Sequence, residues 1–165
     1  MLKTTPLKRR RRQAGNAFVE SSFVFVPLMA IVLAIIDFSM AMFMRATFQH
    51  AVREGVRYAI TYQTMPGLCQ DESIRQVVKD SSAGFLRDSH DSLINITYHP
   101  PSDLSQTATG VGSNAAGNIV EVSVEDFSFG WIAPLMRTDT PLSITVRAAD
   151  KTESLPSGTT TPPCR

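Results

Sequence analysis

The sequence predicts an α+β protein in which one long N-terminal helix carries a small antiparallel sheet domain. An apolar run merges into an amphipathic segment that stops at Pro66-Gly67, and later segments alternate between apolar and polar residues as strands do. Composition changes at the same point, because eight of the ten prolines and seven of the nine glycines follow residue 65. We therefore divide the chain into a basic segment at 1–15, a long helix at 16–65 and an α+β domain at 66–165.

Charge is divided unevenly along the chain. Residues 1–15 hold six bases and no acids, whereas the remainder holds ten bases and fifteen acids. Lys and Arg beside an apolar segment keep that end of a membrane protein in the cytoplasm, so we expect the C-terminal domain to be exported. A solvated tail or a nucleic-acid-binding arm is the other interpretation of an arginine run. The adjoining apolar run favours the membrane, with no nucleic-acid partner.

The apolar run predicts a transmembrane segment at 23–44. These 22 residues would extend about 33 Å as a helix, enough to cross a bilayer. Pro27 removes a backbone hydrogen bond and predicts a kink. An ionised Asp37 in lipid costs about 2.5–3.5 kcal/mol on insertion scales. We therefore expect Asp37 near the outer membrane surface, or paired with a base on another subunit.

The helix is predicted to continue beyond the membrane segment. Phe48, Val52 and Val56 recur at steps of four, and polar residues occupy the other faces. Gly55 weakens a helix by about 1 kcal/mol relative to Ala without ending it. Together the two parts predict one helix of roughly 50 residues, apolar in its first half and amphipathic in its second.

A basic leader ending at Gly15, an acid at Glu20 and an apolar helix together resemble the class III signal of type IV pilins and pseudopilins. Pro27, Asp37 and the run REGVRYA resemble, more specifically, the TadE-like family of the tight-adherence (Flp) pilus. That run comprises Arg53-Glu54-Gly55-Val56-Arg57-Tyr58-Ala59. The resemblance covers residues 13–60, and LSITVRAADKTE is loosely similar to the family's closing strand.

Two positions depart from the related patterns. Asn16 stands where many type IV pilins have Phe, and Ser21 stands where the major pilins of this system have Tyr. The major subunits are also far shorter than this chain. The departures therefore argue against a major fibre subunit.

The resemblance assigns roles to the first residues of the helix. A prepilin peptidase would cut after Gly15 and leave Asn16 as the mature N-terminus. Glu20 would then lie in lipid about one helical turn from the new amine. Because an unpaired buried charge is costly, we expect Glu20 to pair with an amine of its own chain or a neighbour and set the packing register. The alternative is a Glu at the level of the headgroups.

The function implied is a minor pilin or pseudopilin that acts by helix packing in pilus assembly or initiation. Its partners would be the prepilin peptidase, other pilins and pseudopilins, the inner-membrane assembly platform and the lipid bilayer. It would span the bacterial inner membrane once, with a periplasmic domain, before any entry into an extracellular pilus. One alternative is an unprocessed single-span anchor whose exported domain binds a partner. Another is ordinary signal-peptidase cleavage after Ser39-Met40-Ala41, which would release a soluble protein.

The domain is predicted to hold a helix at 73–86 and strands at 93–98, 118–129 and 142–149. In the second strand Val120, Val122 and Val124 share a face, but Phe127 and Phe129 are out of phase with them. A bulge near Glu125-Asp126 would restore a common core face. In the third strand Leu142, Ile144, Val146 and Ala148 are expected to point inward.

Two cysteines lie in the domain, Cys69 at its start and Cys164 at its end. An exported domain meets an oxidising compartment, so an intrachain disulfide is expected, with two free or intermolecular thiols as the alternative. Closing so long a loop stabilises a fold by up to about 4.7 kcal/mol in the chain-entropy description.

The sequence contains no signal for catalysis, so we expect neither an enzyme nor a cofactor. His50, His90 and His99 lack the spacing of metal ligands. Ser89-His90-Asp91 contains the residue types of a catalytic triad, but adjacent residues cannot take up triad geometry.

Overall fold

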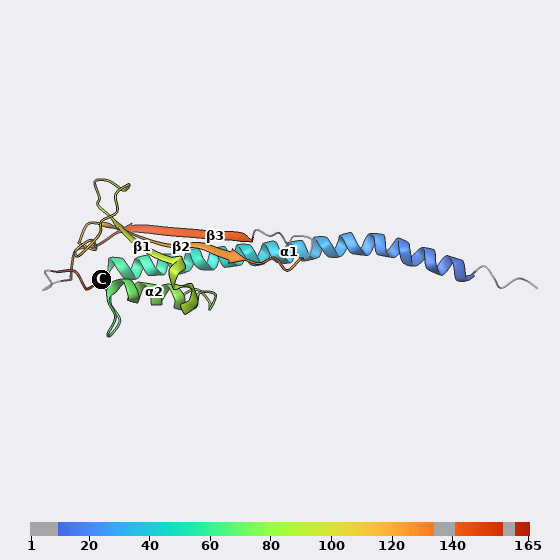
Figure 1. Cartoon of the computed structure of the whole chain (residues 1–165), viewed down its shortest axis with the longest axis horizontal. Coiled ribbons are helices and arrows are strands. Elements are labelled where there is room, and N and C mark those ends of the chain that lie inside the picture. Colours follow the sequence, from blue (N-terminus) through green and yellow to red (C-terminus); the bar gives the residue numbers. More distant parts are fainter. Residues whose placement is uncertain (1–9, 134–140, 157–160) are drawn as a thin grey trace, which may run out of the picture.

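One helix runs almost the whole length of this elongated molecule (Figure 1). The computed structural model describes residues 10–133, 141–156 and 161–165, with side chains from residue 17 onward. Its elements are α1 (Arg10–Ile60), α2 (Gln70–Asp80), the 3₁₀ helix η1 (Asp88–Leu93), β1 (Ile94–His99), β2 (Ile119–Phe129) and β3 (Leu142–Lys151). The N-terminal part of α1 projects from a domain built around its C-terminal half, so the predicted α+β fold is confirmed.

The sheet has three antiparallel strands in the order β1-β2-β3. The predicted bulge is confirmed, because the β2–β3 register shifts between Val124 and Phe127. Asp126 takes a left-handed backbone with φ 56°. This extra residue brings Phe129 to the buried face that Val124 also occupies.

Leu142 departs from the predicted inward pattern of β3. Ile144 and Val146 are buried as expected, whereas Leu142 is 39% exposed. It pairs with Phe129 at the last rung of the sheet. The prediction for Leu142 is wrong because the core ends there, and its side chain instead lines a groove beside Phe38.

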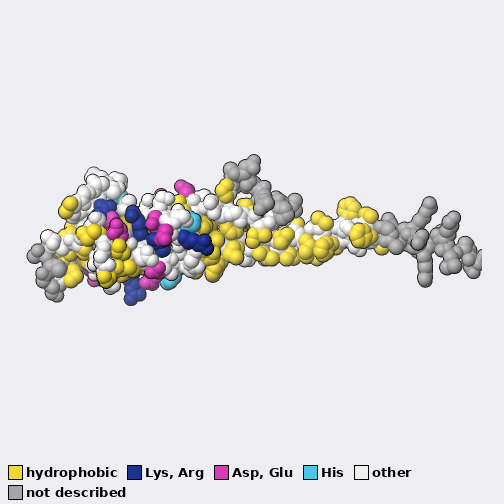
Figure 2. Space-filling view, turned by 60° about the horizontal axis from the view of Figure 1, so that its bottom comes forward, with side chains coloured by type: hydrophobic (Ala, Val, Ile, Leu, Met, Phe, Trp, Pro, Cys, Tyr) yellow, Lys and Arg dark blue, Asp and Glu magenta, His cyan; other side chains and the backbone are white. Residues whose placement is uncertain are grey.

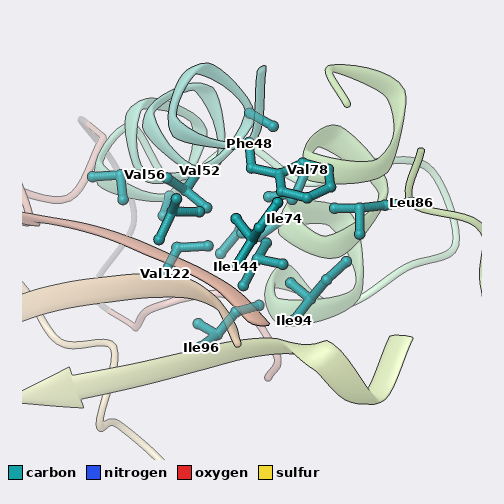
Figure 3. Close-up of a cluster of buried hydrophobic side chains, with 14 of the residues drawn as sticks. Phe48, Val52, Val56, Ile74, Val78, Leu86, Ile94, Ile96, Val122 and Ile144 are labelled. Atoms are coloured by element: carbon teal, nitrogen blue, oxygen red, sulfur yellow. The ribbon is translucent and has the colours of Figure 1, made fainter. Parts of the chain in front are cut away.

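The core lies between the sheet and the two helices, which cover the same face of the strands (Figure 3). Phe48, Val52 and Val56 are buried, which confirms the step of four predicted for α1. They meet Ile74 and Val78 from α2 in one apolar cluster. Burying a side chain of this size contributes about 1.5–3 kcal/mol, so these contacts hold the domain on the helix.

The long helix ends at Ile60, five residues before the predicted end. Tyr62 adopts φ 56°, a left-handed conformation that a helix cannot continue through. The last carbonyls find partners elsewhere: Gln70 Nε2 donates to Ala59 O at 3.0 Å, and Glu153 N donates to Ile60 O at 3.3 Å. Tertiary hydrogen bonds, and not Pro66, therefore fix this terminus.

The second helix is shifted relative to the predicted range 73–86. It begins at Gln70, where Cys69 N donates to Glu72 Oε2 at 3.4 Å, and it ends at Asp80. Ala83 and Gly84 both take positive φ and turn the chain. The prediction extended the helix too far because Phe85 keeps helical spacing in sequence, although it packs on the core from the turn. The 3₁₀ helix η1 was not predicted.

The C-terminal residues are bound to the start of α2. The structure has a disulfide between Cys69 and Cys164, and Gln70 N donates to Cys164 O at 2.8 Å. Arg165 Nε lies 2.7 Å from Asp71 Oδ2. The guanidinium of Arg165 also stacks over Tyr98, 4.7 Å from the ring centre. These contacts close the domain at the end away from the stem.

A buried amide pair fastens the loop between β1 and β2. Asn114 is 1% exposed. Its Nδ2 donates to Gln70 Oε1 at 2.5 Å and to Pro163 O at 3.1 Å. The sequence suggested only a loop of small residues here, because no periodicity indicates a single buried Asn.

Candidate membrane and assembly segment

Residues 17–44 of α1, which we call the stem, present apolar side chains to the surroundings. Within the part of the chain that the structure describes, one helix is long and apolar enough to cross a membrane, and only 6% of its most apolar window is buried. A core helix of a soluble protein would be buried on at least one face. Exposed apolar side chains cover the stem, whereas charged side chains gather on the domain (Figure 2).

The residues predicted for processing lie at the start of this helix. Gly15 and Asn16 belong to the helical backbone of α1, and their side chains are outside the described residues. Glu20 is exposed on the stem. Pro27 lies inside α1, which is helical on both sides of it. Cleavage after Gly15, the Glu20 pairing and the Pro27 kink stay predictions.

The hydroxyl groups of the stem are satisfied within the helix itself. Ser21 Oγ donates to Ala17 O, Ser22 Oγ to Phe18 O and Ser39 Oγ to Ile35 O, at 2.7–2.9 Å. Each bond reaches back four residues, as polar side chains in membrane helices do. These serines therefore do not need water as a partner.

Asp37 is completely buried, although the stem residues around it are largely exposed. Its Oδ1 accepts a hydrogen bond from Ile132 N at 3.0 Å, and its Oδ2 accepts one from Ala133 N at 2.7 Å. Both donors are backbone groups in the segment that follows β2. A carboxylate that receives two N–H groups is stabilised by charge-assisted bonds. Both partners lie in the same chain, 95 and 96 residues away, whereas the sequence suggested a base on another subunit.

The REGVRYA run divides between the core and the surface. A Cβ at Gly55 would lie 2.6 Å from Val78 Cγ2, so only glycine permits α1 and α2 to approach this closely. Val56 and Ala59 are buried on the same side. Arg53 and Arg57 are exposed and line a groove with Arg147 of β3. Glu54 and Tyr58, which complete the run, are half-buried.

The family model described as TadE-like protein matches residues 15–57. Residues 15–57 are TadE-like. The match confirms, over these residues, the resemblance seen in the sequence. No curated protein matches the chain, and no solved structure matches it.

The TadE-like segment contains both the stem and the inner packing face of α1. It ends at Arg57, three residues before the helix does. It therefore includes Asp37 and Gly55, whose contacts place the domain on the helix. The domain residues that they contact, Val78, Ile132 and Ala133, lie outside the matched range.

Ion pairs and a buried tyrosine brace the domain that the TadE-like segment carries. Lys79 Nζ lies 2.9 Å from Asp88 Oδ1 and 3.1 Å from Asp91 Oδ1, which ties α2 to η1. The hydrogen bond with Asp88 raises the pKa of Lys79 and lowers the pKa of Asp88. Tyr98 OH donates to Asp71 Oδ1 at 2.9 Å. Burial, followed by the charge of Asp71, raises the pKa of Tyr98.

His90 and His99 make structural contacts, and His50 is exposed on α1. His99 Nδ1 lies 2.9 Å from Gln106 O, and His90 Nδ1 accepts a hydrogen bond from Arg87 N at 3.2 Å. Within the described ranges, no group of three or more His, Cys, Asp or Glu residues could hold a metal ion. Ser89, His90 and Asp91 fall in η1, and Asp91 pairs with Lys79.

Proposed function

We propose that this protein is a minor pilin or pseudopilin of a tight-adherence pilus, which acts by helix packing after a prepilin peptidase removes its leader. One observation carries the proposal: the TadE-like segment is an exposed apolar stem that leads without interruption into a helix buried in a folded domain. Such a stem leaves its apolar surface for lipid and for the helices of other subunits.

The proposed sequence of events follows from the charges near the N-terminus. Four consecutive arginines, Arg9 to Arg12, keep the leader in the cytoplasm while the domain at 66–165 is exported through the inner membrane. Cleavage after Gly15 removes these charges and creates an amine at Asn16. Glu20 lies about one turn further along the helix and can pair with that amine or with the amine of a neighbour. The pairing would select one packing register among the pilins.

Mass spectrometry of the mature protein tests the processing step. The mature chain should begin at Asn16. Gly15→Ala should be processed better than Gly15→Leu, because a tight peptidase pocket accepts only small side chains there. An intact N-terminus in cells with the peptidase would contradict the proposal and favour an unprocessed anchor that binds its partner through the domain. A chain that begins at Met42 would indicate ordinary secretion.

Crosslinking to the other pilins tests the role of Glu20. Glu20→Ala should still permit insertion and cleavage but impair entry into the assembly, because the neighbouring amine loses its counter-charge. Glu20→Gln should impair it equally if charge matters, and less if hydrogen bonding suffices. Glu153→Gln, which changes an exposed acid of the domain, is the matched control. Wild-type crosslinking by both Glu20 variants would remove this residue from the mechanism.

A further inference from the structure

Among the described residues, Asp37 is the first buried residue of α1. From Ala17 to Ile36 no residue is buried, whereas Asp37 is completely buried against Ile132 and Ala133. Cleavage after Gly15, as in the proposed function, would leave the 21 residues from Asn16 to Ile36 before this contact, or about 30 Å as a helix, which matches the hydrocarbon thickness of a bilayer. This length ends at Asp37, to which the backbone of Ile132 and Ala133 is hydrogen-bonded.

The side chains at this level are those that favour the boundary between lipid and water. Phe38 and Met42 of α1 and Trp131 and Ile132 after β2 form what we call the rim. Ile132 is 60% exposed, and Trp131 is half-buried. A groove runs between α1 and the end of the sheet, and Phe38, Met42 and Trp131 line it together with Arg45. Trp is enriched at headgroup level, and the long side chain of Arg reaches headgroups from above.

The Asp37 contact explains how a loop can lie close to the hydrocarbon of the membrane. Backbone N–H groups without partners are costly near hydrocarbon. Asp37 accepts the hydrogen bonds of Ile132 N and Ala133 N, so both donors are satisfied without water. The same two donors offset the charge of the carboxylate, which would otherwise be costly at this depth. These hydrogen bonds thus lower the cost of placing both the loop and the carboxylate at the edge of the membrane.

We propose that the rim rests in the headgroup layer of the outer face of the bilayer, with Asp37 at the border of the hydrocarbon. The inference rests on the membrane insertion in the proposed function and goes beyond it. It shifts the membrane-spanning segment from the predicted 23–44 to 16–36. The rim would fix the depth of the stem, because a shift along the helix axis would move Trp131 and Ile132 out of the headgroup layer.

The single tryptophan of the chain makes the proposal measurable. Full-length protein is reconstituted in vesicles of phosphatidylethanolamine and phosphatidylglycerol, and insertion is checked by flotation. Lipids brominated near the headgroup should reduce Trp131 fluorescence about twofold, more than lipids brominated at the chain ends, as expected for an interfacial residue. Ile132→Asp should weaken this quenching.

A relocated tryptophan provides the matched control. The loop between β1 and β2 lies at the end of the domain away from the stem (Figure 1). Val111 in that loop is fully exposed. The double variant Trp131→Phe, Val111→Trp should float with vesicles but show no quenching by either lipid.

Each remaining outcome overturns the inference. A floating wild-type protein without quenching would place the rim above the membrane and leave the pilin proposal standing. Stronger quenching from the chain ends would place the rim inside the hydrocarbon. If the fluorescence of Trp131 changes only when other pilins are added, the rim is a contact between subunits. Failure to float would contradict membrane insertion itself, and with it the proposed function.

Discussion

Asp37 joins two regions that are far apart in sequence, the stem and the segment after β2. Both of its carboxylate oxygens accept backbone hydrogen bonds, at 2.7 and 3.0 Å. Charge-assisted bonds of this kind are worth about 1.5–3 kcal/mol each, and more is lost when a buried group is left without a partner. A single side chain thus holds the lower end of the domain against the helix.

Replacing this carboxylate should release the segment after β2. In Asp37→Asn the amide keeps the shape but loses the charge, and only its oxygen still accepts. The amide hydrogens of Ile132 and Ala133 should therefore exchange faster with solvent. Hydrogen exchange read by mass spectrometry on full-length protein in nanodiscs measures this. Ser39→Ala is the control, because the hydroxyl of Ser39 donates to Ile35 O of its own helix. Unchanged exchange, with altered copurification of other pilins, would instead support the intermolecular pairing expected from sequence.

Tyr98 should make the fold sensitive to alkaline pH. Burial raises the pKa of its hydroxyl in the folded state, so folding favours the neutral form. The resulting stability is fully present below the unfolded pKa of about 10 and is lost as pH rises above it. Tyr98→Phe should lower stability at neutral pH by about 1 kcal/mol through the lost Asp71 bond, yet flatten the alkaline decline.

Thermal unfolding at a series of pH values measures the Tyr98 effect. Tyr58→Phe, at a half-buried position, is the control and should keep the alkaline decline of the wild type. An equally steep decline in Tyr98→Phe would show that other groups cause it.

At the scale of elements, α1 and α2 pack closely at Gly55. Gly55 and Ala59 leave room for α2, whereas Phe48 and Val52 fill the space toward the core cluster. A helix that packs closely against another helix needs small side chains where the two approach. The REGVRYA run therefore has a structural reason for its glycine.

Gly55→Ala should destabilise the domain although alanine favours helices. The new Cβ would lie 2.6 Å from Val78 Cγ2, and overpacking of this kind costs about 1–3 kcal/mol. The gain in helix propensity, about 1 kcal/mol, offsets only part of it. Thermal unfolding of Gly55→Ala alone and together with Val78→Ala separates the two effects, because the second change removes the clashing methyl group. If Gly55→Ala lowers stability as much in the Val78→Ala background as in the wild type, the steric explanation is wrong.

The disulfide should hold the C-terminal residues on α2. Cys69 and Cys164 are 95 residues apart, and crosslinking so long a loop is worth up to about 4.7 kcal/mol in the entropy description. A reductant should lower the unfolding temperature of the wild type and leave Cys69→Ser/Cys164→Ser unchanged. The double variant in turn should resemble the reduced wild type. Equal stability of oxidised and reduced protein would show that the contacts of Gln70 and Arg165 suffice.

At the scale of the whole molecule, a basic segment, an apolar stem and a packed domain follow one another along the sequence. The bases of residues 1–15 precede an apolar stem, and the acids are concentrated in the domain. The Coulomb preference for Lys and Arg on the cytoplasmic side therefore acts at one end only. The orientation of the chain should depend on this end.

Neutralising the leader should disturb that orientation. Replacing Arg9, Arg10, Arg11 and Arg12 by Gln should leave part of the population with the domain in the cytoplasm. A phosphatase fused after Arg165, which is active only outside the cytoplasm, should lose activity accordingly. Replacing Arg53, Arg57 and Arg147 by Gln in the domain is the control and should keep the activity. Full phosphatase activity in the leader variant would mean that the stem alone sets the topology.

Features with local causes could be predicted. The step of four along α1, the strand alternation and the bulge at Asp126 each follow from residues within one segment. The ends of the elements were less accurate, because the carbonyls of Ala59 and Ile60 are capped by Gln70 and Glu153 from elsewhere in the fold. The buried Gln70–Asn114 pair was missed for the same reason, since its partners are 44 residues apart.

By itself, the sequence determined that a basic head, an apolar helix and a small α+β domain follow one another, and that residues 15–57 are TadE-like. Those properties depend on order and periodicity, which act over a few residues. Only the tertiary structure decided why Gly55 must be small and what Asp37 binds. Each depends on a group brought close by folding, Val78 for Gly55 and the backbone of Ile132 and Ala133 for Asp37. Such a contact produces no periodic pattern in the sequence, because a hydrogen bond or a close approach involves single atoms.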